Sequence, residues 1–215
     1  MKKHLSFLGA VLTAGVLAVP AYAADSSYYV SGDAGVSLFS NITPKDPTQI
    51  QQGTLTTSAG IDVLGAVGMK FDSWRVEGEF GYQRNNAKQI SDNTGLTLNA
   101  TGNISVTSLL ANGYYDFIAG GVNPYLSAGI GWASVGINNF GKVGQNNSNN
   151  NSLLSESHSA LGYQFGAGVA IPLSKSIDLD ARYRYFGTGN ISMNNQGGDY
   201  KVTGSDFLVG LRIGF

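Results

Sequence analysis

Two runs of this sequence place charged residues at every second position. One run extends from Trp74 to Tyr82 and the other from Ile177 to Tyr185. Neighbouring residues of a strand point to opposite faces, so each run gathers its charges on one face. The charged residues of the two runs are Arg75, Glu77, Glu79, Asp178, Asp180, Arg182 and Arg184. Side chains of opposite sign held together in this way can form ion pairs or can line a path for ions.

A catalytic reading centres on His158, because His4 falls in the amino-terminal segment described below. A base and a nucleophile two positions apart in a strand would share a face. The positions two residues from His158 hold Glu156 and Ala160, neither of which is a hydroxyl nucleophile. One histidine with scattered carboxylates also has no metal-ligand spacing. We therefore expect no enzyme activity, no metal and no cofactor.

Composition narrows the class of protein further. The chain has 215 residues, a net charge of −1, 13% charged residues, 30 glycines and no cysteine. A near-neutral charge argues against nucleic-acid binding, which normally requires a basic surface. The lack of cysteine excludes disulfides, thiol catalysis and zinc sites with cysteine ligands. Glycine runs such as Gly129-Ile130-Gly131 precede no helix, so they carry no nucleotide-binding signal.

The elements that must position the charges are strands. Besides the two charged runs, weaker alternation of apolar and polar residues covers 28–39, 61–71, 104–117, 124–137, 159–171 and 202–215. This period-two pattern predicts eight strands, although it does not decide which face is which in 104–117 and 124–137. No apolar stretch of the mature chain reaches the length of a membrane-spanning helix.

The connections between these strands alternate in length. Short links are expected at 72–73, 119–123 and 172–176, and long polar links at 40–57, 84–103, 138–158 and 187–200. The third long link contains an asparagine-rich run at 145–152, which is typical of a solvated loop. Short turns at one end and long loops at the other predict an all-β fold, an eight-stranded antiparallel up-and-down β-barrel.

Three observations place the charged face inside this barrel and the apolar face in a membrane. The charges nearly balance, as a closed polar interior requires. Aromatic residues lie near strand ends, where they suit the two interfaces of a membrane. These aromatic residues are Trp74, Tyr82, Tyr125, Tyr183, Tyr185 and Phe207. The chain also ends within a strand, on an aromatic residue with apolar residues at alternate positions before it.

The amino terminus has the features of a signal peptide. Lys2 and Lys3 precede an apolar run from Leu5 to Val19, and Ala21-Tyr22-Ala23 forms an A-x-A cleavage site. We therefore expect residues 1–23 to be a cleaved signal peptide and residues 24–215 to be one barrel domain.

Several motifs together resemble a known family. The terminal strand, with Phe207, Val209, Leu211, Ile213 and Phe215 at alternate positions, resembles the assembly signal of bacterial outer-membrane barrels. The segments 75–82, 112–117, 124–131 and 183–185 resemble strand motifs of the opacity-like, porin-family small barrels, which are related in architecture to the OmpA and OmpX barrels. The resemblance implies a Gram-negative outer-membrane location and contact with the barrel-insertion machinery during assembly.

Two readings of the predicted interior remain open at this point. The seven charged residues, extended by Asp33, Asp62, Lys70, Asp206 and Arg212, either fill a closed lumen or line a narrow channel. An eight-stranded barrel is just wide enough for its own side chains, which favours filling. Glycines at 129, 131, 162, 166 and 168 are expected to leave room beside large interior side chains.

The expected function follows from the loops. We expect a monomeric protein that contacts outer-membrane lipid and either supports the envelope or binds a host or surface ligand through its long loops. The alternative is a small porin-like channel for ions or small solutes.

Overall fold

The computed structural model describes residues 26–40, 54–91, 97–117, 120–142, 154–192 and 199–215. The expected signal peptide and the asparagine-rich run at 145–152 lie outside these ranges. Within them, no helix is both long enough and apolar enough to cross a membrane.

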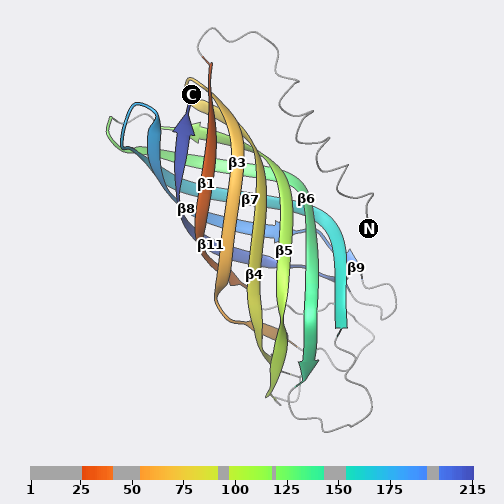
Figure 1. The fold of residues 1–215 in the computed structure, drawn as a ribbon. Helices are drawn as coiled ribbons and strands as arrows, with labels where there is room; N and C mark the ends of the chain where they lie inside the picture. The colour runs from red at the N-terminus through yellow and green to blue at the C-terminus, as the bar shows by residue number, and fades with distance from the viewer. Residues whose placement is uncertain (1–25, 41–53, 92–96, 118–119, 143–153, 193–198) are drawn as a thin grey trace.

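The described chain is built from antiparallel strands (Figure 1). Their bounds are β1 Ser26–Phe39, β2 Thr54–Thr57, β3 Gly60–Phe71, β4 Trp74–Ser91, β5 Thr97–Asp116, β6 Asn123–Lys142, β7 Leu154–Pro172, β8 Ile177–Thr188, β9 Ile191–Ser192, β10 Asp199–Tyr200 and β11 Thr203–Gly214. Each of the eight predicted strands corresponds to one long strand of this set.

The long strands close into a ring. Their order is β4-β3-β1-β11-β8-β7-β6-β5, and β5 pairs again with β4. The first and last strands, β1 and β11, pair from Tyr29 opposite Gly214 to Phe39 opposite Gly204. Each strand of the ring therefore has a partner on both sides, and closure removes the unpaired edges that an open sheet would present. The predicted eight-stranded barrel is confirmed.

Tight turns join the strands at the end of the barrel where β1 begins. The turn between β3 and β4 consists of Asp72 and Ser73, and Asp72 has a φ of 56°. Between β5 and β6, Gly120 and Gly121 have φ values of 68° and 102°, a region that favours glycine. These turns lie where short links were predicted.

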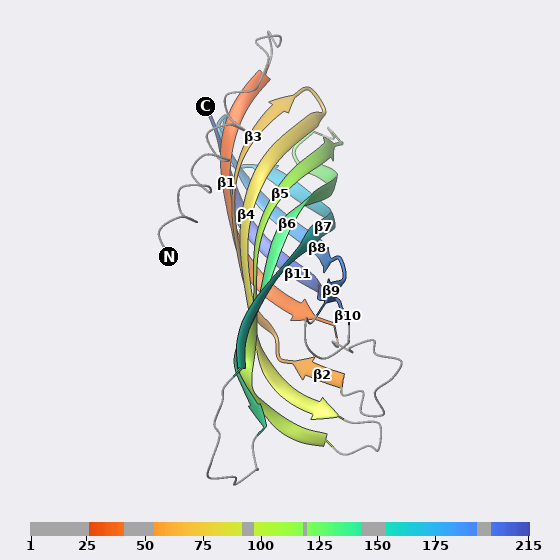
Figure 2. The same cartoon turned by 90° about the vertical axis from the view of Figure 1, so that its right-hand side faces the viewer.

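The other end of the barrel is uneven. Strands β4, β5, β6 and β7 have 18, 20, 20 and 19 residues, whereas β1, β3, β8 and β11 have 12 to 14. The extra residues extend one side of the barrel by about 20 Å of strand. In Figure 2 the far ends of β4 and β5 lie well beyond the end of β1, with β2 beside them. We call this extension of β4–β7 the projecting wall.

The projecting wall corrects two of the predicted long links. Residues 84–103 and 138–158 were expected to be loops, but β4 continues to Ser91, β5 starts at Thr97 and β6 continues to Lys142. Backbone pairing continues through polar sequence, for example between Gln89 and Asn99. Both faces of a strand that extends beyond a membrane meet water. The sequence of such a strand therefore lacks the apolar alternation of the membrane-embedded strands.

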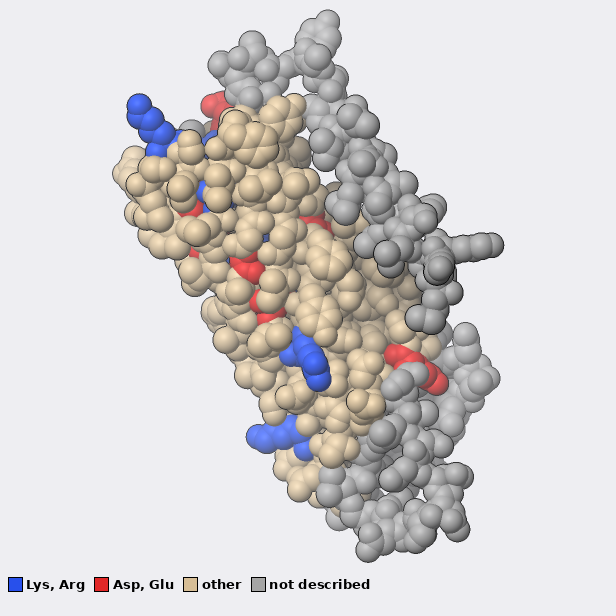
Figure 3. Space-filling model, in the orientation of Figure 1, with Lys and Arg blue, Asp and Glu red and all other residues tan. Residues whose placement is uncertain are grey.

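The outward face of the ring is apolar over the part nearer the tight turns. Exposed large apolar side chains include Val36, Val63, Phe80, Ile130, Phe165 and Val209, from six different strands. On the face seen in Figure 3, Lys, Arg, Asp and Glu side chains are few and most of the described surface is formed by other residues. Trp74, Tyr82, Tyr183, Tyr185 and Phe207 face outward as predicted, but Tyr125 is buried in the interior. The prediction for Tyr125 was wrong because its ring lies over Gly168 on β7, where a wider residue would not fit.

Candidate functional site: the ion-pair network of the barrel interior

Strand alternation turns one set of side chains into the barrel, and most of that set is polar. Arg75, Glu77 and Glu79 of β4 and Asp180, Arg182 and Arg184 of β8 are buried. Because β4 and β8 stand on opposite sides of the ring, their long side chains meet across the interior. Asp178, at the start of β8, is the most exposed of the seven predicted residues, with 35% of its side chain accessible.

Arg75 occupies the interior near the tight turns. Its guanidinium bonds Asp116 of β5 through Nε at 2.9 Å and Nη2 at 2.9 Å, and Glu77 through Nη1 at 3.3 Å. The Tyr29 hydroxyl donates to the same Glu77 carboxylate at 2.6 Å. The guanidinium carbon also lies 4.2 Å from the centre of the Tyr114 ring. Such charge-assisted bonds and ring stacking hold the arginine in one position.

Arg182 forms the middle of the network. Its Nη2 lies 3.3 Å from Asp33 of β1, and its Nη1 lies 3.2 Å from Glu79. The same Nη1 donates to the Tyr114 hydroxyl at 2.8 Å. One arginine therefore connects three other strands of the barrel.

Arg184 binds three carboxylates nearer the outer end. Its Nη2 lies 2.8 Å from Asp62 of β3, its Nε 2.9 Å from Asp206 of β11 and its Nη1 3.3 Å from Glu79. Nη1 also donates to Gln164 of β7 at 3.1 Å. Glu79 thus joins Arg182 and Arg184 in one group of ion pairs.

A fourth arginine, Arg212 of β11, closes the network at the inner end. Its Nε lies 3.3 Å from Asp178 and its Nη2 3.4 Å from Asp180. The Tyr125 hydroxyl donates a hydrogen bond to Asp180. The network is therefore larger than the seven residues predicted, and it includes the proposed extensions Asp33, Asp62, Asp206 and Arg212.

Several members of the network were not predicted from the sequence. Asp116 was not predicted, and it accepts hydrogen bonds from Nε and Nη2 of Arg75. Lys70, which was a predicted extension of the charge set, has its Nζ 3.7 Å from Asp116 Oδ2. Interior carboxylates outnumber interior cations, and neutral donors supply the difference. These donors are Tyr29, Tyr125, Gln83, Gln164 and Asn112, each of which donates to a carboxylate. Strand alternation could have identified Asn112, because Asn112, Tyr114 and Asp116 of β5 alternate with outward residues.

Glycines make room for the interior rings. Gly68 is the cross-strand partner of Tyr29, and Gly168 is the partner of Tyr125. A Cβ atom at either glycine would lie 2.4 Å from the tyrosine ring, far inside van der Waals contact. Gly131, in contrast, lies against the backbone carbonyl of Leu109, and Gly162 lies against apolar side chains.

An apolar cluster occupies the outer end of the interior, beyond the network. Its buried members are Phe39, Ile104, Val106, Leu110, Ala133, Val135, Phe186, Ile191, Tyr200 and Val202. Ile191 and Tyr200 come from β9 and β10, which follow β8 and precede β11 along the chain and pair with each other. Burial raises the pKa of Tyr200 to about 12. The short β9–β10 ladder thus brings apolar side chains over the charged interior.

The terminal strand lies in the wall rather than in the interior. Phe207, Val209, Leu211 and Ile213 of β11 all face outward. Phe215 is 77% exposed, and its backbone N–H donates to the Tyr28 carbonyl at 2.9 Å. The residues of the predicted assembly signal therefore share one apolar face at the seam between β1 and β11.

His158 has a carboxylate neighbour but no nucleophile. Its Nε2 lies 3.2 Å from Glu156, while the hydroxyl of Ser157 pairs with Ser134 at 2.9 Å. Within the described part of the chain, no three histidine or carboxylate side chains gather as metal ligands.

Comparison with known proteins agrees with this architecture. Outer membrane protein PagN of Salmonella typhimurium is 32% identical over 130 residues, which are 55% of this chain and 53% of PagN. The match thus spans about half the length of that relative. Neisserial surface protein A superposes with a TM-score of 0.57 and 18% identity, covering 89% of this chain and 99% of that one. The outer membrane protease OmpT from Escherichia coli superposes with a TM-score of 0.53 and 8% identity, covering 88% and 97%.

The decisive match is to a family model. The model described as the outer membrane protein beta-barrel domain matches residues 9–215, nearly the whole chain. The ring of eight strands, its apolar outward face and its polar interior are the features that this match leads one to expect. The chain belongs to the outer membrane protein beta-barrel domain family and is a protein of the Gram-negative outer membrane.

Proposed function

We propose that this barrel is a non-conducting surface protein, whose projecting wall and loops bind a ligand outside the cell. The observation that carries the proposal is the filled interior, in which buried ion pairs occupy the membrane-embedded part and an apolar cluster occupies the outer end. A protein of this kind uses its barrel as an anchor, and its activity resides in the part that extends beyond the membrane.

The contacts of the network support a closed interior. Arg75, Arg182 and Arg184 are each held by at least two carboxylates, and their side chains are at most 5% exposed. An ion entering this space would have to break several charge-assisted bonds. It would then meet the apolar side chains of Phe186 and Val202, which offer no ligand.

The projecting wall supports a role at the surface. It is a paired sheet rather than a set of loops, so it presents side chains at fixed positions. Its outer part is joined by β2, which pairs with β4 from Thr54 opposite Ser91 to Thr57 opposite Ala87. A ligand that meets this wall meets a surface that is already ordered, which lowers the entropic cost of binding.

The chemistry of the described residues supports binding rather than catalysis. His158 has Glu156 beside it, and the nearest hydroxyls, Ser157 and Ser159, point to the opposite face. The likeness to the OmpT protease concerns the fold alone, since only 8% of residues are identical.

Planar-bilayer recording tests the closed interior. We expect the purified, detergent-folded protein to show no stable conductance, because each interior arginine is fixed by its partners. Reproducible current steps that change with Arg182→Gln, but not with the outward Arg84→Gln, would establish the channel alternative instead.

Adhesion measurements test the surface role. Bacteria that express the barrel should bind host cells or matrix, and replacing residues 89–99 by a tight turn should abolish binding. Gln89 pairs with Asn99, so this change removes the tip of one hairpin and keeps the ring. Unchanged heat-modifiable migration in gels would show that the variant folds. Equal binding by cells with and without the protein would refute the role.

Export and assembly complete the proposal. Residues 1–23 are removed as a signal peptide, and the insertion machinery recognises the outward face of β11 that ends at Phe215. Amino-terminal sequencing of the protein from outer membranes should begin at Ala24.

A further inference from the structure

The apolar belt of the barrel ends sharply on β5, β6 and β7, on the side of the projecting wall. Leu109, Trp132 and Leu161 lie side by side across these strands. Trp132 and Leu161 are exposed, and strand alternation places the half-buried Leu109 on the same outward face. The next outward residues are Thr107, Ser134 and Ser159. Acyl chains therefore give way to lipid headgroups at the level between these two rows.

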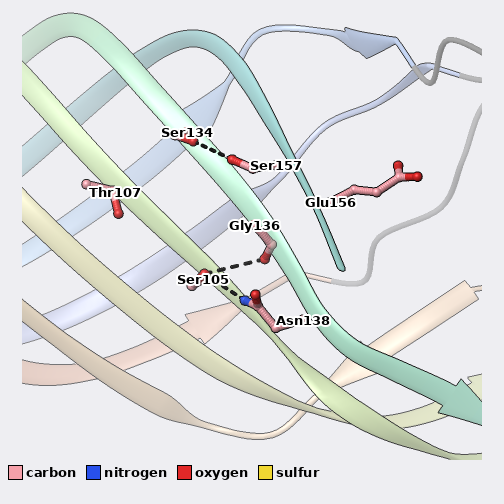
Figure 4. Close-up of a pocket in the computed structure, with 7 residues that line it drawn as sticks. All are labelled: Ser105, Thr107, Ser134, Gly136, Asn138, Glu156 and Ser157. Atoms are coloured by element: carbon pink, nitrogen blue, oxygen red, sulfur yellow. Dashed lines mark hydrogen bonds between the residues drawn. The ribbon is translucent and has the colours of Figure 1, made fainter. Parts of the chain in front are cut away.

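A polar pocket lies immediately beyond this limit, on the side away from the tight turns. Figure 4 shows the residues that line it. It is a hollow of about 300 Å³ lined by Ser105, Thr107, Ser134, Gly136, Asn138, Glu156 and Ser157. Gly136 has no side chain, which leaves space between the rows of hydroxyls.

The lining groups of the pocket are oriented by one another. Ser134 and Ser157 share a hydrogen bond of 2.9 Å, and Asn138 Nδ2 donates to Ser105 Oγ at 3.2 Å. In Figure 4 the Glu156 side chain points away from these groups on the other side of β7. The centre of the pocket is therefore formed by hydroxyls and an amide, which can both donate and accept hydrogen bonds.

The surroundings of the pocket are amphipathic. Trp132 lies two residues before Ser134 on the same face of β6, so its indole borders the pocket on the membrane side. On the adjacent strand, the exposed Arg84 of β4 is the direct partner of Ser105. At the membrane surface, an apolar row thus borders the hydroxyl pocket, and a cation lies beside the pocket on the next strand.

We infer that this pocket binds the saccharide headgroup of an outer-leaflet glycolipid. Sugar hydroxyls match neutral donors and acceptors, whereas an anionic phospholipid headgroup would favour a cluster of cations. The acyl chains of the lipid lie along Leu109, Trp132 and Leu161, and Arg84 contacts an acidic substituent of the sugar. The lipid source is favoured over a soluble sugar because the pocket opens on the outward face and continues into the apolar belt. This inference does not depend on the proposed surface role.

Tryptophan fluorescence can report binding, because the chain has two tryptophans and Trp74 lies at the opposite end of the barrel. In the Trp74→Phe background, Trp132 is the single emitter. The folded protein is placed in phospholipid nanodiscs with increasing fractions of lipopolysaccharide. We expect a saturating change in Trp132 emission with lipopolysaccharide and none in phospholipid alone.

Variants then test the pocket itself. The triple change Ser105→Ala, Ser134→Ala and Ser157→Ala should raise the lipopolysaccharide fraction at half-saturation by at least about tenfold, since several hydrogen bonds are lost. Ser205→Ala removes an outward hydroxyl on β11 and should leave it unchanged. Equal titrations of the triple variant and its parent would overturn the inference. An equal response to the saccharide released from its lipid would overturn the lipid source.

Discussion

Replacing Arg184 with methionine removes the cation that Asp62, Asp206 and Glu79 share. Glu79 keeps its contact with Arg182, whereas Asp62 loses a 2.8 Å contact and Asp206 loses one of 2.9 Å. All three carboxylates stay buried, and methionine offers them no hydrogen bond. Breaking a buried ion pair in this way costs about 3–5 kcal/mol, so we expect the free energy of unfolding to fall by that amount.

Urea unfolding of the folded protein in detergent micelles or vesicles, followed by tryptophan fluorescence, measures this change. The matched control is Arg84→Met, an exposed outward arginine of β4, which should change stability by less than about 0.5 kcal/mol. The double change Arg184→Met and Asp62→Asn should recover part of the loss, because it removes one of the stranded charges. If Arg184→Met and Arg84→Met unfold at the same urea concentration, the network does not stabilise the barrel and this reasoning fails.

Three further outcomes are expected. Gly168→Val should lower the free energy of unfolding by about 1–3 kcal/mol because its side chain meets the Tyr125 ring, while Gly78→Ala, with nothing within 4 Å, should be close to neutral in the same urea assay. Because the pKa of Tyr200 is raised to about 12, the folded protein retains its phenol proton where the unfolded chain has lost it, and stability should decline between about pH 10 and pH 12; Tyr200→Phe should remove that part of the pH dependence. Deleting Phe215 should reduce the amount of barrel inserted in outer membranes but barely change urea unfolding of protein folded in detergent, since the side chain is 77% exposed.

The membrane-embedded part of the barrel was predictable because each of its strands has two different solvents. Lipid on one side and a polar interior on the other impose period-two alternation, which is plain in the runs around Val76 and Leu179. The same contrast places Arg75, Arg182 and Arg184 inside. The closure of β1 against β11 agrees with the apolar alternation that ends at Phe215.

The projecting wall was missed because this contrast disappears beyond the membrane. Residues such as Gln89 and Asn99 pair as strands but have water on both faces, so their sequence reads as a loop. Gly102, with a φ of 112°, and Asn139, with a φ of 51°, lie beside irregularities in the pairing and look like turn residues. Their positive φ values belong to bulges that bend the wall rather than end it.

The interior was only partly predictable because its partners are not all charged. Tyr125 was assigned to a membrane interface by residue type, yet its hydroxyl binds Asp180 and its ring occupies the space above Gly168. Asp116 stands at the end of its strand beside a turn, where a solvated carboxylate is the usual expectation. Both assignments depend on which residue lies across the strand pair, and register is a property of the folded sheet.

The alternation of interior and lipid-facing side chains also restricts how the length of this chain can change over evolution. A single inserted residue between Ile104 and Asp116 would turn the side chains on one side of it to the opposite face, exchanging interior groups such as Tyr114 with lipid-facing groups such as Tyr115. Inherited insertions in β4–β7 should therefore come in steps of two residues, matched on both strands of a hairpin, or fall at existing bulges. Length changes in the connections between strands carry no such parity, so two kinds of variation should be distinguishable along one molecule.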